Sequence, residues 1–313
     1  MKKELIQIFP LHLRDGLKTL IFSEDLLEEI RIRVGQPILF LMAGKEMYFH
    51  KERRTLQNGA DDAYRITVED LQSMIKFISS YSIYAYEDEI KRGFLTIQGG
   101  HRIGLAGQVV MAGEKILSMS HICFLNIRVA KQKRGCAKEL IPYLIDRDSV
   151  YNTLIVSPPG IGKTTYLRDT IRILSDGSKE LAGKQISVID ERSEIAACRQ
   201  GIPQNDIGRR SDVLDGCLKS QGMLFMLRSM APQIIAVDEI GTKEDCHALE
   251  QALYCGCKII GTVHAYDVTE LTQKPYLREL LEQKMFGRIV MLEKKEGGAR
   301  GFRVYDGNLT KIC

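Results

Sequence analysis

The stretch from Leu154 to Thr165 constrains the fold of this 313-residue chain more than any other part of it. The apolar run Leu154-Ile155-Val156 is typical of a buried strand, and a turn rich in proline and glycine follows it. Gly162-Lys163-Thr164-Thr165 then begins a segment with helical periodicity. A strand, a glycine-containing loop and a helix that starts at Gly-Lys-Thr form the setting of a phosphate-binding loop. The sequence therefore predicts a nucleotide site on an α/β sheet.

The predicted ligands of this loop are ATP and Mg²⁺. The loop comprises Ser157, Pro158, Pro159, Gly160, Ile161, Gly162, Lys163, Thr164 and Thr165. Its backbone N–H groups and the positive helix terminus would hold the β-phosphate, Lys163 would reach the β- and γ-phosphates, and the Thr164 hydroxyl would bind Mg²⁺. The pattern usually begins with glycine, whereas this chain has Ser157, which is costly at positive φ. The entry of the loop is therefore expected to differ slightly.

Composition and charge exclude several classes of protein. The formal net charge is only +4, which does not favour a nucleic-acid partner, and no run of 18 apolar residues predicts a membrane span. The start, Met1-Lys2-Lys3-Glu4, lacks the apolar core of a signal peptide. Without an export signal, the eight cysteines are expected to be reduced thiols in a cytosolic protein.

A metal site at Cys246, His247, Cys255 and Cys257 is the less favoured reading of those residues. Their spacing matches no zinc pattern, and the segment from residue 246 to 256 has the apolar spacing of a helix. We expect small buried side chains there.

Residues 1–135 are predicted to form a smaller α+β domain. Strict alternation at residues 29–34, a turn, and the runs 38–42 and 46–50 predict a series of antiparallel strands, followed by a loop at 51–63. A capping box at Thr67 predicts a helix over 71–80, and glycine-punctuated strands at 93–129 predict a meander. The basic stretch Lys131-Gln132-Lys133-Arg134-Gly135 could touch a nucleotide or an acidic surface, but a solvated linker is the favoured interpretation.

Residues 136–313 are predicted to form an α/β domain with a doubly wound, mostly parallel sheet. A helix at 137–146 is expected to lead into it. Strand-like runs then alternate with segments of helical period. These runs are residues 153–157, 186–190, 234–238 and 258–263, and a hairpin of 288–293 and 300–306 closes the chain.

Two acids end the strand Ile234-Ile235-Ala236-Val237, and they predict hydrolysis. Asp238 would hold Mg²⁺, through water, and Glu239 would orient and deprotonate the attacking water. Such an acid pair beside a phosphate loop favours hydrolysis over transfer to a second small substrate.

A second strand, Ser187-Val188-Ile189, also ends in acids. Asp190, Glu191 and Glu194 are candidates for binding the metal's waters or for shaping the field around the attacking water. The alternative is that they pair with Arg192 and its neighbours at the surface. Function is favoured for Glu191, and the two readings are even for Glu194.

His264 and three arginines complete the candidate site. His264 ends the strand Gly261-Thr262-Val263 and could hydrogen-bond the γ-phosphate or relay its loss to a neighbour. Arg209, Arg210 and Arg228 are candidates for compensating phosphate charge, within one chain or between neighbours.

The order of these motifs resembles that of the type II and type IV secretion ATPase superfamily, with its Walker A, Asp box, Walker B and His box. The segment Leu227-Arg228-Ser229-Met230-Ala231-Pro232 is similar to the segment that precedes Walker B in this family. Within the superfamily, residues 188–195, 228–232 and 237–241, with 29–33 and 124–129, look like a sporulation subgroup, so the resemblance covers most of the chain. Asp238 stands where the motors commonly have glycine, and Gly241 where they commonly have arginine; both departures fit that subgroup.

The resemblance implies a RecA-like domain in a cytoplasmic mother-cell ATPase that assembles with itself, as a hexamer. Such a ring would associate peripherally with a membrane-embedded, secretion-like complex around the engulfed forespore and energise it. Two alternatives remain: a RecA-like motor acting on nucleic acid, which the low charge disfavours, and a regulatory nucleotide-binding adaptor that hydrolyses rarely.

Overall fold

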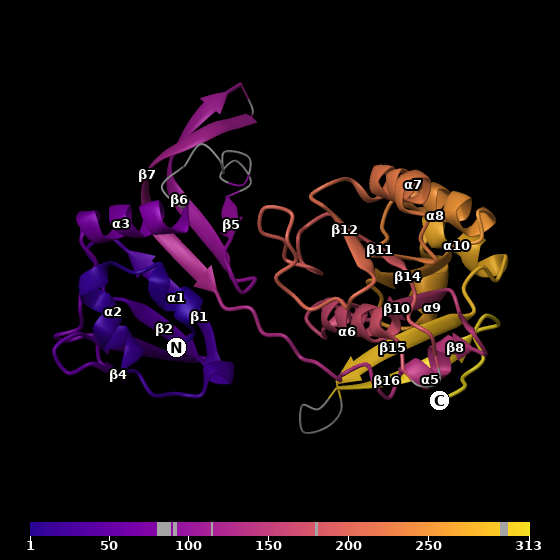
Figure 1. Ribbon diagram of the computed structural model, residues 1–313, viewed down its shortest axis with the longest axis horizontal. Coiled ribbons are helices and arrows are strands. Elements are labelled where there is room, and N and C mark those ends of the chain that lie inside the picture. The colour runs from indigo at the N-terminus through magenta and orange to yellow at the C-terminus, as the bar shows by residue number, and fades with distance from the viewer. Residues whose placement is uncertain (80–88, 90–92, 114, 179–180, 295–299) are drawn as a thin grey trace. The chain divides into compact units, whose positions relative to one another are not determined.

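The computed structural model describes the chain except for residues 80–88, 90–92, 114, 179–180 and 295–299 (Figure 1). Contacts within the chain divide it into two compact units, Met1–Lys131 and Gln132–Cys313. No helix of the described residues is long and apolar enough to cross a membrane. The domain boundary predicted after residue 135 stays a prediction.

The first unit is built on an antiparallel sheet with strand order β4-β3-β2-β1-β7-β6-β5. Its strands are β1 (Leu27–Arg33), β2 (Leu39–Met42), β3 (Lys45–His50), β4 (Thr55–Gln57), β5 (Phe94–Thr96), β6 (Arg102–Ala112) and β7 (Lys115–Arg128). The predicted turns and the predicted meander are present. The loop predicted at 51–63 is wrong in part, because β4 within it pairs with β3.

Three helices supply the rest of the first unit's core: α1 (Lys3–Gln7), α2 (Leu11–Lys18) and α3 (Val68–Ile78). Leu5, Leu13 and Leu17 pack in one cluster with the strand residues Ile30 and Phe40. The capping box predicted at Thr67 is confirmed, because its side chain accepts a hydrogen bond from the backbone N–H of Asp70 and its own backbone N–H donates to the Asp70 carboxylate. The helix ends at Ile78, and the predicted last residue, position 80, lies outside the described residues.

The second unit is built on a sheet with strand order β12-β11-β13-β14-β10-β15-β16. Its strands are β10 (Thr153–Val156), β11 (Ile186–Asp190), β12 (Ser211–Asp215), β13 (Ile234–Val237), β14 (Lys258–Val263), β15 (Arg288–Lys294) and β16 (Arg300–Asp306). All neighbours pair in parallel except β15 and β16, which form the predicted antiparallel hairpin. The predicted α/β class with a mostly parallel sheet is confirmed.

Helices cover both faces of this sheet, as Figure 1 shows. They are α5 (Ile141–Leu144), α6 (Lys163–Asp176), α7 (Lys219–Met230), α8 (Lys243–Tyr254), α9 (Val268–Gln273) and α10 (Pro275–Glu282). Helix α6 packs on one face with Ile155 and Val188. Helices α7, α8 and α10 pack on the other face with Leu154 and Ile189. Neighbouring strand residues thus enter opposite cores, as expected of a sheet covered on both sides.

The segment before this sheet differs from the helix predicted over 137–146. Turns occupy residues 134–140, α5 has four residues, and β8 (Ile145–Asp146) pairs with β9 (Ser149–Val150). Pro142 lies in the first turn of α5, the one place where its missing N–H is not needed by the helix. The apolar spacing was therefore that of a buried turn, with Ala137 and Leu140 fully buried.

Candidate nucleotide site

The phosphate loop runs from the end of β10 into α6, and its glycines have the backbone geometry the loop needs. Gly160 has φ of 80° and Gly162, which precedes the first residue of α6, has φ of 111°. Side chains rarely tolerate this region. Ser157 is not among the described residues with positive φ, so serine begins the loop without backbone strain. Its hydroxyl donates a hydrogen bond to the Pro158 carbonyl at 2.8 Å.

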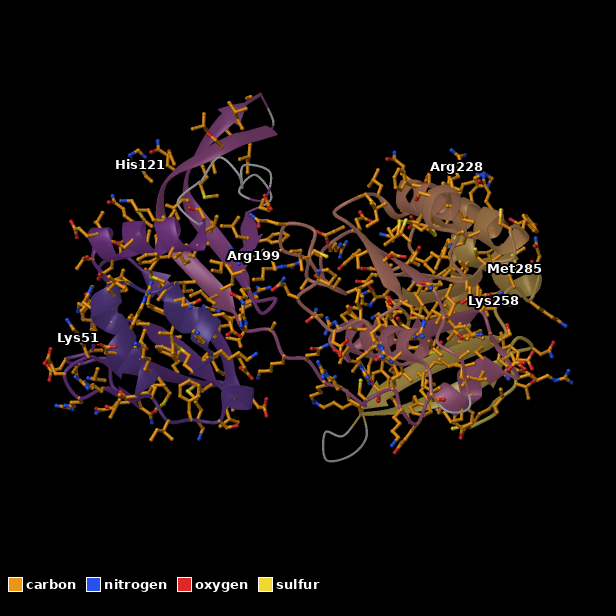
Figure 2. The ribbon with its side chains drawn as sticks, viewed as in Figure 1. Lys51, His121, Arg199, Arg228, Lys258 and Met285 are labelled. Carbon is orange, nitrogen blue, oxygen red and sulfur yellow. The ribbon has the colours of Figure 1, made fainter. Side chains whose placement is uncertain are left out.

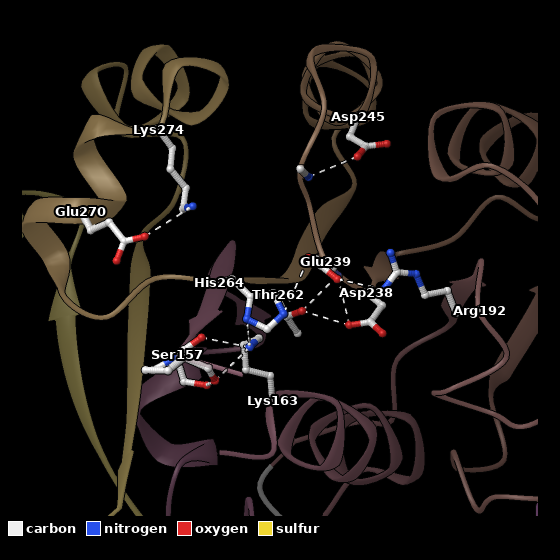
Figure 3. A network of polar contacts seen from close by, with 12 residues as sticks. Ser157, Lys163, Arg192, Asp238, Glu239, Asp245, Thr262, His264, Glu270 and Lys274 are labelled. Atoms are coloured by element: carbon white, nitrogen blue, oxygen red, sulfur yellow. Dashed lines mark hydrogen bonds and ion pairs between the residues drawn. The ribbon is translucent and has the colours of Figure 1, made fainter. Parts of the chain in front are cut away.

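Lys163 points back over this loop from the start of α6 (Figure 3). Its Nζ donates to the Ser157 carbonyl at 2.9 Å and contacts His264 Nδ1 at 2.7 Å. Burial lowers the pKa of the Lys163 ammonium, and the negative charges of Glu239 and Asp238 oppose that change. An ammonium only donates, so His264 Nδ1 accepts and the proton of a neutral ring lies on Nε2. That nitrogen is 3.6 Å from Glu239 Oε1.

Thr262 fixes the two acids at the end of β13. Its hydroxyl donates to Asp238 Oδ1 at 3.0 Å and accepts from the backbone N–H of Glu239 at 3.0 Å. Glu239 has φ of 26°, a value outside the usual range for this residue type. Its carboxylate contacts His264 on one side and Arg192, at 3.3 Å, on the other. Lys163, His264, Glu239 and Asp238 therefore form one connected polar group beside the phosphate loop (Figure 3).

The acids at the end of β11 are placed differently. Asp190 is fully buried, and its carboxylate accepts the backbone N–H groups of Glu194, Ile195 and Ala196 at 2.8 to 3.0 Å. Burial raises the pKa of Asp190 in spite of these bonds. Both oxygens of the Asp190 carboxylate thus anchor the following loop. Its part in binding the metal's waters or in shaping the field around the attacking water stays a prediction.

Glu191 pairs with Lys219, the first residue of α7. The sequence offered Arg192 as an alternative partner for this acid. The structure instead pairs Glu191 with a residue of α7. Glu194 is exposed, and its carbonyl accepts a hydrogen bond from Arg168. A catalytic part for Glu191 stays a prediction.

The three candidate arginines lie away from the phosphate loop of their own chain. Arg209 bonds to Asp176, and Arg210 to the carbonyl of Ser175, both at the last turn of α6. The loop is at the opposite end of this 14-residue helix, which spans about 20 Å. Arg228 is exposed in the last turn of α7 and points outward (Figure 2). Compensation of phosphate charge within one chain is therefore wrong for Arg209 and Arg210.

The side chains at the start of α6 and the end of β13 fit a bound magnesium ion. Among the described residues, none hydrogen-bonds the Thr164 hydroxyl, and none bonds Asp238 Oδ2. Oxygen ligands of this kind, completed by phosphate and water, are what Mg²⁺ prefers. Thr164 and Asp238 are thus free to hold it directly or through water.

Cys246, His247, Cys255 and Cys257 do not gather into a site of the described chain. Cys246 is buried in the core, Cys257 donates to the Pro232 carbonyl, and Cys255 is exposed. No group of three or more metal-ligating side chains occurs among the described residues.

A cavity of about 750 Å³ opens beside the phosphate loop on the side of β15 and β16. Pro159, Gly160 and Ile161 of the loop and Tyr166 of α6 line it. Its other walls are the connection from residue 133 to 139 and the ends of the last hairpin, Lys294 and Arg300. This volume is ordinary for a small-molecule site. The sequence did not reveal this cavity, nor the roles of Thr262 and Arg192, because their partners are distant along the chain.

Together, the phosphate loop, the acids that follow β13 and the mostly parallel sheet define a phosphate-loop protein of the α/β class. Two solved structures share this fold. For the pilus retraction motor PilT with bound ADP, the TM-score is 0.60 at 14% identity, over 90% of this chain and 79% of that one. For the ATPase DotB of Legionella pneumophila it is 0.57 at 16% identity, over 89% of this chain and 76% of that one.

The family follows from sequence comparison. The model of the family described as sporulation stage III, protein AA, matches residues 1–312. Stage III sporulation protein AA of Bacillus subtilis is 38% identical over 97% of this chain and 94% of its own. The uncharacterized protein ycf45 of Porphyra purpurea is 25% identical over 89% of this chain, but over only 43% of its own length. The chain belongs to the stage III sporulation protein AA family, which confirms the resemblance seen in the motifs.

Proposed function

We propose that this protein is a Mg²⁺-dependent ATPase. The observation that carries the proposal is the connected group of Lys163, His264, Glu239 and Asp238 at the phosphate loop. This group combines three functions: the Lys163 ammonium can bind phosphate, Glu239 can take a proton from water, and Asp238 can hold a magnesium-bound water. The solved structures of similar fold are those of an ATPase and of a pilus retraction motor with bound ADP, which supports the same chemistry.

Each residue has a defined part in this proposal. Lys163 leaves the Ser157 carbonyl and His264 when the phosphates arrive, because the ammonium binds the anionic oxygens more strongly than a neutral carbonyl. Glu239 then accepts a proton from the attacking water, and His264 hydrogen-bonds the γ-phosphate or relays its loss to a neighbour. Thr164 and Asp238 would hold Mg²⁺, which would neutralise charge on the phosphates when bound. Glu191, which is paired with Lys219, would make a small contribution to the field around the metal's waters.

We further propose that the protein works as a homo-oligomeric ring, a hexamer, during endospore formation. Arg228 supports this view, because its exposed position on α7 leaves it available to a neighbouring subunit's nucleotide. Family membership supports a role in sporulation, at the cytoplasmic face of a membrane complex around the forespore that the ring would energise.

ATP hydrolysis by the purified protein, with and without Mg²⁺, tests the activity, and Lys163→Ala is the matched variant. We expect magnesium-dependent release of phosphate from the parent and loss of both nucleotide binding and turnover in the variant. Retained affinity in Lys163→Ala would contradict the site. Turnover that single-stranded DNA strongly stimulates would instead favour a nucleic-acid motor, and binding with negligible turnover in the parent would favour an adaptor.

The mass of the particle with ATP and Mg²⁺ tests the ring. A hexamer is expected, and a monomer would contradict the trans role of Arg228.

A further inference from the structure

Arg300, the first residue of β16, lies against the phosphate loop although it is far from it in sequence. A Cβ placed on Gly162 would be 2.7 Å from Arg300 Nη1, so the guanidinium rests on the glycine that precedes α6. The charge of Arg300 also acts on Tyr166, where it opposes the rise in pKa that burial causes. A cation therefore stands beside the backbone N–H groups that are expected to hold phosphate.

Within the described chain, the side chain of Arg300 has no hydrogen bond or ion pair. The side chains of Lys133, Lys138 and Lys294, which line the same cavity, likewise make no hydrogen bond or ion pair with a described residue, and Glu139 is the one acid among the described residues of its lining. Basic side chains just outside the cavity behave differently: Arg134 pairs with Asp206 at 3.1 Å, and Arg303 with Glu293 at 2.8 Å. The unpaired positive charge is concentrated on the wall of the cavity, where it favours an anion.

The order of strands predicts which part of a bound nucleotide would supply the anion that this cavity favours. Strand β10, which leads into the loop, lies between β14 and β15. The groups proposed to act on the γ-phosphate, Glu239 and His264, follow β13 and β14 on one side. Arg300 and the cavity lie on the other side, with β15 and β16. A nucleotide whose γ-phosphate meets Glu239 therefore directs its α-phosphate and nucleoside toward Arg300.

We infer that Arg300 is a nucleotide ligand that binds the α- or β-phosphate from the side opposite the catalytic acids, while the cavity receives the nucleoside. The inference rests on the proposed function, since it uses the same phosphate loop. Guanidinium groups bind phosphate oxygens through two parallel N–H bonds, and the cost of ordering this exposed side chain is met by its charge-assisted bonds. These phosphates are present in both ATP and ADP, and a guanidinium on the side opposite the catalytic acids would bind oxygens that take no part in the bond to the γ-phosphate.

Arg300 should therefore contribute equally to ground state and transition state. Loss of the guanidinium raises the Kd for ADP and the KM for ATP, and leaves kcat nearly unchanged. One or two charge-assisted hydrogen bonds correspond to a factor of about ten to a hundred.

The experiment compares the full-length parent with Arg300→Ala, Arg300→Lys and Arg303→Ala. Arg303 is the matched control, because it lies on the same strand but faces the other side and is paired with Glu293. Calorimetric titration with MgADP gives the Kd, and steady-state hydrolysis gives KM and kcat. We expect Arg300→Ala to weaken ADP binding and raise KM by about tenfold to a hundredfold. Arg300→Lys should recover part of the loss, because charge without the two-pronged geometry remains, and Arg303→Ala should match the parent.

Three results would overturn the inference. If the parent binds ADP and Arg300→Ala binds it equally well, Arg300 is no ligand although the proposed function stands. If kcat falls while KM is unchanged, Arg300 acts on the transition state and not as a ground-state ligand. If the parent binds neither ADP nor ATP, the inference and the proposed function fail together.

Discussion

Strands β11 and β13 are neighbours in one parallel sheet, and both end in Asp-Glu, yet the two pairs of acids have different surroundings. At β11, the loop that follows folds back and gives three N–H groups to Asp190. At β13, one backbone N–H of the described residues reaches the Asp238 carboxylate, together with the hydroxyl of Thr262. The same pattern of residues thus produces a loop anchor in one place and a candidate metal holder in the other.

The second acid of each pair differs in the same way. Glu191 is neutralised by Lys219, whereas Glu239 faces His264 and Arg192 at the edge of the phosphate loop. The partner that each carboxylate finds, and not its position at the end of a strand, decides what it can do. Substitutions at these four acids test this difference directly.

The largest effect is expected from Glu239→Gln. An amide cannot take a proton from water, so hydrolysis should fall by about 10²- to 10⁴-fold while ATP still binds. Phosphate release and ATP binding are the two measurements. A variant that turns over ATP at the parent's rate would remove Glu239 from the mechanism.

The second-largest effect is expected from Asp238→Asn. If Asp238 holds a magnesium-bound water, the concentration of Mg²⁺ needed for half-maximal hydrolysis should rise by about ten- to a hundredfold. Titration of activity with MgCl₂ measures it. The urea midpoint should stay at the parent's value, since the carboxylate keeps few internal bonds; a magnesium requirement identical to the parent's would argue against the assignment.

Asp190→Asn should act on stability. An amide NH₂ in place of an oxygen leaves at least one of the three buried N–H groups without an acceptor, which costs about 1–3 kcal/mol of the free energy of unfolding. Urea denaturation of the second unit's transition measures the cost. A parent-like midpoint together with an altered magnesium requirement would give Asp190 the role that we assign to Asp238.

Glu191→Gln should have the smallest effect. The pair with Lys219 is partly exposed, and such a pair is worth about 1 kcal/mol or less, or about fivefold in rate. Hydrolysis under saturating ATP and Mg²⁺ measures it. A loss as large as that in Glu239→Gln would show that Glu191 acts on the water itself and that its pairing with Lys219 is not maintained during turnover.

Much of the fold could be predicted from the sequence because its signals are local. Runs such as Ile234-Ile235-Ala236-Val237 have the length and composition of buried strands, and the capping box at Thr67 is contained in four residues. The errors also have local causes. Ala137 and Leu140 are spaced as in a helix, but burial in a turn requires the same apolar residues.

The residues of the candidate site could be predicted from the sequence, but most of the contacts between them could not. Lys163, Asp238, Glu239 and His264 were named from their places at the ends of strands or at the start of a helix, and the parallel sheet brings them to one edge. The contacts of Arg300 with Gly162 and of Thr262 with the acids were not predictable, because no short-range pattern reports a contact between distant segments.

By itself, the sequence determined the phosphate loop, the class of sheet and the family, because these depend on residue order and on spacings that repeat within a few positions. The tertiary structure alone decided which carboxylates are taken up by hydrogen bonds within the chain and which are available to a metal ion or a water. Hydrogen bonds and burial depend on what the chain brings alongside a carboxylate, so Asp190 and Asp238 became different groups only when β11, β13 and β14 were paired. The pairing of β15 with β10 and with β16 placed the Arg300 guanidinium next to the loop, where a phosphate can meet it.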